Sequence, residues 1–168
     1  MSFLKIARRV ERAVYPVVGA VHKVGLGLLI AMMLLTVVDV IGRKFFDSPI
    51  TGSYELTEFM LALIVFFSVG YTQIQKGHIA MEALVSRFSS RAQALTDSIV
   101  YLISIGLGGL LTWQLVAHAK RTYLGKHETG VLHLPLYPFL LAAAFGCLLY
   151  SLVLLVDFLL SLEKARKP

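Results

Sequence analysis

The chain has 168 residues, of which 57% are hydrophobic and 15% are charged, and its net charge is +6. Soluble domains carry about 25% charged residues, so this composition and a mean hydropathy of +0.76 exclude an ordinary soluble domain and indicate an integral membrane protein. The basic residues lie near the ends of apolar runs, where they set membrane orientation, so nucleic-acid binding is the weaker explanation. The single cysteine, Cys147, excludes an internal disulfide and a cysteine-based metal cluster.

The N-terminal region begins with a basic segment and continues into an apolar run. Residues 3–18 combine four basic residues with apolar residues on one helical face, which predicts an amphipathic segment on an anionic lipid surface. A frayed terminus and a secretory signal peptide are the alternatives. The first membrane span is expected over residues 24–41. Asp39 lies in its last turn and Arg43 lies four residues later, a spacing that predicts an ion pair at the helix end.

The second span is expected over residues 56–75, after a turn-rich connection. About 20 apolar residues in a helix cross the hydrocarbon core of a bilayer. Thr51 or Ser53 is expected to cap this helix, and Glu55 lies in its first turn, where the helix dipole favours a carboxylate. Over residues 77–92 the apolar positions become one-sided, which predicts a helix lying on the membrane surface.

Two further spans are expected over residues 98–117 and 136–157. The middle of the third span contains three glycines that allow a neighbouring helix to approach closely: Gly106, Gly108 and Gly109. The sequence therefore predicts an all-α integral membrane protein with a single membrane domain, four transmembrane helices, an N-terminal amphipathic segment and a surface helix after span two.

The distribution of basic residues predicts the orientation. Eleven of the 16 Lys and Arg residues lie in the terminal segments and the second connection, and five lie in the first and third connections. The positive-inside rule then places both termini and the surface helix in the cytoplasm, with loops 42–55 and 118–130 facing outward. We expect a multi-pass membrane protein.

The residues offer no site for catalysis, and no cofactor or metal is predicted. The sequence has no nucleophile–base arrangement, Gly-rich phosphate loop, HExxH or CxxC motif. Haem between helices requires axial histidines at compatible depths. His22 lies near the inner edge of span one and His118 near the outer edge of span three, whereas His118 and His133 share the outer side. A haem- or quinone-binding membrane anchor of a respiratory enzyme is therefore kept as the alternative.

A solute-binding site is also not predicted. Ion-coupled carriers bind their ligands near the bilayer midplane, using polar groups and broken helices. The middles of these spans contain apolar residues and three isolated hydroxyls that are expected to bond their own backbone, namely Ser68, Ser104 and Thr112. This pattern disfavours an autonomous carrier or channel and favours a chain that supports another subunit.

Short motifs at the ends of the spans carry a family resemblance. They are Val40-Ile41-Gly42-Arg43 with Phe46, Gly52 with Glu55-Leu56, Gly77-His78-Ile79 leading into Met81-Glu82-Ala83-Leu84, and Leu134-Pro135-Leu136. In these motifs and in its four-span plan, the chain resembles the small membrane subunit of TRAP (tripartite ATP-independent periplasmic) transporters, the DctQ-like family. The Gly-His-Ile element is the most specific of them, and Glu82 matches an acidic position that often follows it.

The resemblance implies a heteromeric transporter of the bacterial inner membrane with three parts. A periplasmic solute-binding protein would capture an organic anion, often a carboxylate, and a large multi-span subunit would move it in symport with sodium. The small subunit would act as a scaffold for the large subunit and help to dock the binding protein, and it would not be an enzyme.

Two sets of residues are candidates for these roles. Structural or partner-interface roles are expected for five polar residues: Asp39, Arg43, Glu55, His78 and Glu82. Docking of the binding protein is expected to involve four outward-facing basic residues: Lys44, Lys120, Arg121 and Lys126. Solvation or contact with membrane phospholipids is the alternative for the basic residues.

Overall fold

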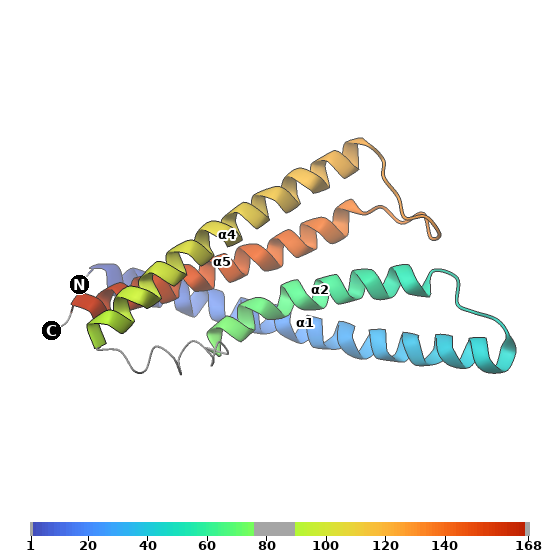
Figure 1. Ribbon diagram of the computed structural model, residues 1–168, viewed down its shortest axis with the longest axis horizontal. Helices are drawn as coiled ribbons and strands as arrows, with labels where there is room; N and C mark the ends of the chain where they lie inside the picture. The colour runs from blue at the N-terminus through green and yellow to red at the C-terminus, as the bar shows by residue number, and fades with distance from the viewer. Residues whose placement is uncertain (1, 76–89, 167–168) are drawn as a thin grey trace.

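The computed structural model describes residues 2–75 and 90–166, and this part of the chain forms four long helices (Figure 1). They are α1 (Ser2–Phe46), α2 (Ser53–Ile74), α4 (Ser90–Leu124) and α5 (Tyr137–Arg166). Each helix contains a segment long and apolar enough to cross a membrane: Val10–Phe46, Ser53–Ile74, Ile99–Leu124 and Tyr137–Ser161. The predicted all-α membrane fold is therefore confirmed.

The helices lie lengthwise beside one another and alternate in direction (Figure 1). Both termini lie at one end of the bundle, which we call the termini end. The connections over residues 47–52 and 125–136 lie at the opposite end, which we call the loop end (Figure 1). Four spans must bring the two termini to one side, and the structure has this arrangement.

Helix α5 is the centre of the bundle. In an apolar stretch of 18 residues within its spanning segment, 44% of the residues are buried, whereas the share is 11% in the corresponding stretches of α1 and α2 and 6% in that of α4. Helix α4 packs on α5, α1 packs on α2, and both α1 and α2 also contact α5. The outer faces of α1 and α4 are therefore largely uncovered and apolar, as expected for surfaces that face lipid or a partner subunit.

The tightest apolar packing lies toward the termini end. Val18, Leu149 and Val153 form a buried cluster, with Val14 and Tyr71 packed against it. Residues 3–18 belong to the same continuous helix as the first expected span, because α1 runs from Ser2 to Phe46 without a break. Val14 of the apolar face predicted for the N-terminal segment packs against this core, whereas Val17 of the same face is exposed and its neighbour Val18 is buried instead.

Two glycines, one on α5 and one on α4, allow neighbouring helices to pack closely against α5. A side-chain carbon at Gly146 would lie 2.5 Å from the carbonyl oxygen of Phe66, so α2 and α5 approach to backbone contact there. A side-chain carbon at Gly108 would lie 2.5 Å from Oγ of Ser151, so Gly108 serves the contact between α4 and α5. The other two glycines of the third span, Gly106 and Gly109, have no atom within 4 Å of that position.

The predicted surface helix over residues 77–92 falls almost wholly outside the described residues, as do His78 and Glu82. Ser90 already belongs to α4. These expectations stay predictions.

Candidate functional site at the loop end

The carboxylate of Asp39 joins three segments at the loop end. The Asp39 side chain is 7% exposed, and its Oδ1 accepts a hydrogen bond of 2.8 Å from the backbone N–H of Ile50. Its Oδ2 accepts from the guanidinium of Arg43, which confirms the predicted ion pair. The same nitrogen of Arg43 lies 3.4 Å from Oγ of Ser53, at the start of α2. Asp39 and Arg43 therefore tie the end of α1 to the connection and to α2.

The turn between α1 and α2 depends on a close backbone approach. The N–H of Ser48 donates to the carbonyl of Gly42 over 3.2 Å, and a side-chain carbon at Gly42 would lie 2.8 Å from the Ser48 carbonyl oxygen. The cap predicted for α2 is wrong. Its N-cap residue is Gly52, in the left-handed conformation with φ of 78°, and no side chain caps the helix. Left-handed backbone favours glycine over Thr51 or Ser53.

Glu55 makes a contact that its position in the first helical turn did not predict. Its Oε1 accepts a hydrogen bond of 2.8 Å from the N–H of Val131, and its Oε2 accepts one of 3.0 Å from the N–H of Leu132. Both donors belong to the connection between α4 and α5. The carboxylate thus holds the tip of one connection against the start of α2, and we call this contact the Glu55 clamp. The side chain of Leu132 completes it by occupying the space beside Gly52.

The connection that Glu55 holds has its own internal structure. The N–H of Thr129 donates to the carbonyl of Leu134, and the N–H of Leu134 donates to Oγ1 of Thr129, both over 3.0 Å. Glu128 and Pro135 form an isolated antiparallel bridge. The segment is therefore a folded hairpin-like loop, and Glu55 satisfies two N–H groups at its tip that would otherwise need water.

The structure places all four predicted docking residues at the loop end with exposed side chains. Lys44 lies in the last turn of α1, Lys120 and Arg121 lie in the last turns of α4, and Lys126 follows in the connection. They form two groups: Lys44 lies on α1, and the other three lie at the end of α4 and in the connection after it. Exposed basic side chains beside an ordered loop suit contact with an acidic surface.

A second polar cluster, at the termini end, was not predicted. Nε2 of Gln73 donates a hydrogen bond of 2.8 Å to Oδ2 of Asp157, and both residues are buried. Nearby, the ring of His22 stacks on Tyr71 with centroids 4.2 Å apart. The signal in the sequence was the apolar run Phe158–Leu160 after Asp157, which places this carboxylate inside the helix and away from its end.

The described histidines do not converge on one point. His22 lies toward the termini end, whereas His118, His127 and His133 belong to the last turns of α4 and the connection after it. His118 and His133, the pair predicted to share the outer side, are both exposed. Nδ1 of His133 lies 3.7 Å from Oε2 of Glu128. Within residues 2–75 and 90–166, no three His, Cys, Asp or Glu side chains gather as metal ligands do.

A comparison with protein families identifies the chain. The family described as "Tripartite ATP-independent periplasmic transporters, DctQ component" matches residues 32–164. The chain belongs to the DctQ family. No curated protein and no solved structure matches it. The match covers the loop end with the Glu55 clamp, the last third of α1, all of α2 and α4, and most of α5, so the resemblance carried by the short motifs is confirmed.

Family membership and four apolar helices together give the general role. The chain is the small membrane component of a tripartite transporter and a multi-pass inner-membrane protein. The DctQ family is one of transporter components, and it lends no support to a haem- or quinone-binding anchor.

Proposed function

We propose that this DctQ-family chain braces the large transport subunit and does not itself bind the transported solute. The observation that supports this is the position of its buried polar residues. Among the described residues, all of them lie toward one end of the bundle or the other: Asp39, Ser53, Thr122 and Thr129 at the loop end, and Gln73, Asp157 and Ser161 at the termini end.

The middle of the bundle is packed with small and apolar side chains. Buried positions there include Ala143, Ala144 and Cys147 of α5. Two hydroxyls at this depth bond the backbone of their own helices: Thr112 donates to the carbonyl of Gly108, and Ser151 donates to that of Cys147. Ion-coupled carriers place the groups that bind ions and substrates near the bilayer midplane. The absence of free polar side chains from the buried positions named here therefore favours a supporting role.

The outer face of α4 is the surface we propose for the large subunit. Only 6% of the residues in an apolar 18-residue stretch of its spanning segment are buried, and Leu110 and Trp113 are exposed on this helix. Gly106 and Gly109 leave open space on this helix. Small residues let the backbones of two membrane helices approach closely, which would suit contact with a helix of the partner. Gly108 faces α5 and is excluded from this role.

Replacing both open glycines tests the scaffold proposal. We expect Gly106→Leu with Gly109→Leu to lower the amount of large subunit that co-purifies, because two leucines would hold the helices apart. Gly27→Leu is the matched control, since Gly27 on α1 is equally open. Thermal melting of the isolated chain should be unchanged in both variants. If the double variant retains the large subunit as well as Gly27→Leu does, α4 is not the interface.

The orientation and the docking role are further parts of the proposal. Both termini would lie in the cytoplasm and the loop end in the periplasm, supported by the excess of basic residues in the terminal segments and the second connection. Lys120, Arg121 and Lys126 would then meet acidic groups of the binding protein. His78 and Glu82, on the cytoplasmic side, keep their proposed structural role.

Charge reversal tests docking separately. Lys120→Glu with Arg121→Glu should reduce uptake and raise its dependence on the concentration of binding protein, because the surface would repel acidic groups. Co-purification with the large subunit should stay at the wild-type level. Wild-type uptake at limiting binding protein would remove the docking role and leave the scaffold role standing.

The transported solute and its coupling belong, in this proposal, to the other two components. The family resemblance favours sodium-coupled uptake of an organic anion such as a carboxylate. A sodium gradient across vesicles that contain all three components, with and without a panel of carboxylates outside, would test both statements.

A further inference from the structure

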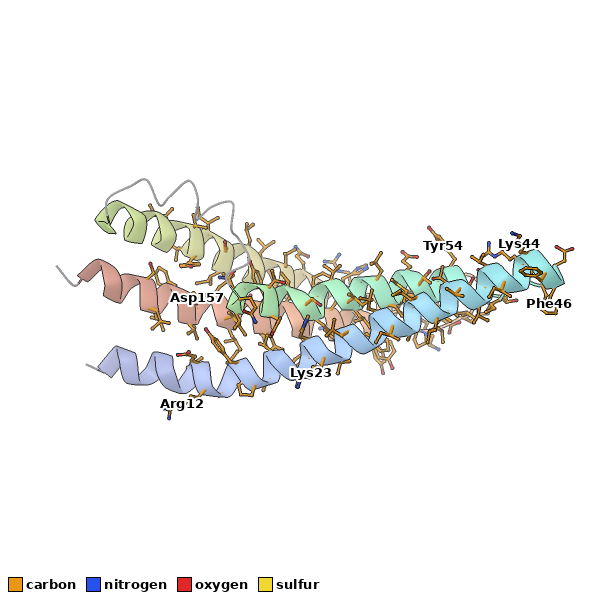
Figure 2. The ribbon with its side chains drawn as sticks, turned by 90° about the horizontal axis from the view of Figure 1, so that it is seen from below. Arg12, Lys23, Lys44, Phe46, Tyr54 and Asp157 are labelled. Carbon is orange, nitrogen blue, oxygen red and sulfur yellow. The ribbon has the colours of Figure 1, made fainter. Side chains whose placement is uncertain are left out.

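An open groove runs between α1 and α2 toward the loop end. It has a volume of about 520 Å³, within the range of small-molecule sites. Its lining comes from one face of α1 and from the first turns of α2: Met32, Thr36, Asp39, Val40, Arg43, Lys44, Ser53, Tyr54 and Thr57. Lys44 and Tyr54 project to the same side of this helix pair (Figure 2).

The groove changes in character along its length. Its charged side chains, Asp39, Arg43 and Lys44, all lie near the loop end. Val40 lines it beside Asp39, and Thr36 and Met32 line it farther along α1, where the hydroxyl of Thr36 donates to the Met32 carbonyl. The rise from Met32 to Lys44 is about 18 Å along a helix, comparable to the thickness of half a bilayer.

The polar end of the groove favours an anion. Asp39 is already bonded to Arg43 and to the N–H of Ile50. A guanidinium has five N–H donors, so Arg43, whose side chain is 58% exposed, retains donors for a ligand. Lys44 forms no salt bridge with any residue that the structure describes. Two cations and one carboxylate leave this end with a net positive charge.

We propose that this groove binds an anionic phospholipid of the leaflet at the loop end. The phosphate would lie against Arg43 and Lys44, and an acyl chain would follow Val40 toward Met32. The order of groups in the groove, cationic at the bilayer surface and apolar toward the bilayer centre, matches the order along a phospholipid. The hydroxyl of Tyr54 lies where it can bond the headgroup or the glycerol esters.

Lipid binding to the purified full-length chain tests this site. Native mass spectrometry in detergent would titrate phosphatidylglycerol against phosphatidylcholine with the same acyl chains. We expect tighter binding of phosphatidylglycerol, and a loss of about fivefold in Lys44→Gln, the size of effect of one basic residue at an anionic surface. Val40→Phe, which fills the groove without changing charge, should weaken the binding of both lipids.

Matched controls separate this site from general attraction. Lys126→Gln removes one charge at the same end outside the groove, and Val38→Phe enlarges an α1 residue of similar exposure that does not line it. Both should bind lipid as the wild type does, and millimolar inorganic phosphate should not displace the lipid. Equal losses in Lys44→Gln and Lys126→Gln, no loss in Val40→Phe, or displacement by phosphate would each overturn the proposal.

Discussion

The two ends of the bundle are held together in different ways. At the termini end, α1, α2 and α5 meet over packed apolar side chains around Val18 and Val153, with the Gln73–Asp157 bond buried beside them. At the loop end, the Asp39 and Glu55 carboxylates bind backbone N–H groups of the two connections. Complementary helix surfaces therefore hold the termini end together, whereas hydrogen bonds between helix ends and loops hold the loop end together.

This difference separates stability from position. Packing at the termini end involves residues throughout three helices, so a change there should affect folding of the whole bundle. The loop-end bonds involve a few groups at the edge of the bundle, so a change there should release a loop while the helices stay in place. Three variants test this separation, from the largest expected effect to the smallest: the first changes helix packing in the middle of the bundle, the second the polar contact at the termini end, and the third the Glu55 clamp at the loop end.

Gly146→Leu should destabilise the isolated chain most. Its side chain would collide with the carbonyl oxygen of Phe66 on α2, and overpacking of this kind typically costs about 1–3 kcal/mol. Thermal melting in detergent measures the change. Gly106→Leu is the matched control, because nothing lies within 4 Å of Gly106. Equal melting temperatures for the two variants would mean that α2 and α5 do not meet at Gly146.

Gln73→Leu should have an intermediate effect. It replaces the amide by an apolar side chain of similar size and removes the N–H that donates to Asp157, and the loss of one intramolecular hydrogen bond costs about 0.5–1.5 kcal/mol. The melting temperature should fall, whereas Gln75→Leu, which lies two residues away and removes an exposed hydrogen bond to the Tyr71 hydroxyl, should melt close to the wild type. A Gln73→Leu variant as stable as the wild type would show that the buried bond does not hold α2 to α5.

Glu55→Gln should have the smallest effect on melting and a clear local effect. An amide oxygen accepts more weakly than a carboxylate, so the tip of the connection after α4 should open more often. Hydrogen exchange of the Val131 and Leu132 amides should become severalfold faster, while exchange in the middle of α5 is unchanged. Glu58→Gln, at an exposed position one turn later, is the control. Unchanged exchange at Val131 would contradict the clamp.

The features that follow from local spacing were predictable from the sequence. Runs of apolar residues of membrane-crossing length predicted the four helices, and the interval of four residues between Asp39 and Arg43 predicted their ion pair. The hydroxyl of Thr112 bonds its own helix as expected. In each case the interacting groups lie within one or two helical turns, so the helical repeat alone brings them together.

The features that depend on packing between distant segments were not predictable. Glu55 and Val131 lie 76 residues apart, and their contact requires the relative positions of two connections. Gly146 lies in an apolar run, and nothing in the sequence around it indicates that α2 packs against it. The three glycines of the third span looked equivalent, and only the helix arrangement shows that Gly108 faces α5 while Gly106 and Gly109 do not.

The Glu55 clamp also has a consequence for biogenesis. Its carboxylate leaves the ribosome 76 residues before the first amide that it binds, an interval of about 4–15 s at ordinary rates of synthesis. During that time the carboxylate stays hydrated at the bilayer surface. The clamp can form only after the third span has been inserted and the following loop has reached the same side of the membrane, so the closed contact marks a subunit whose third span has crossed correctly.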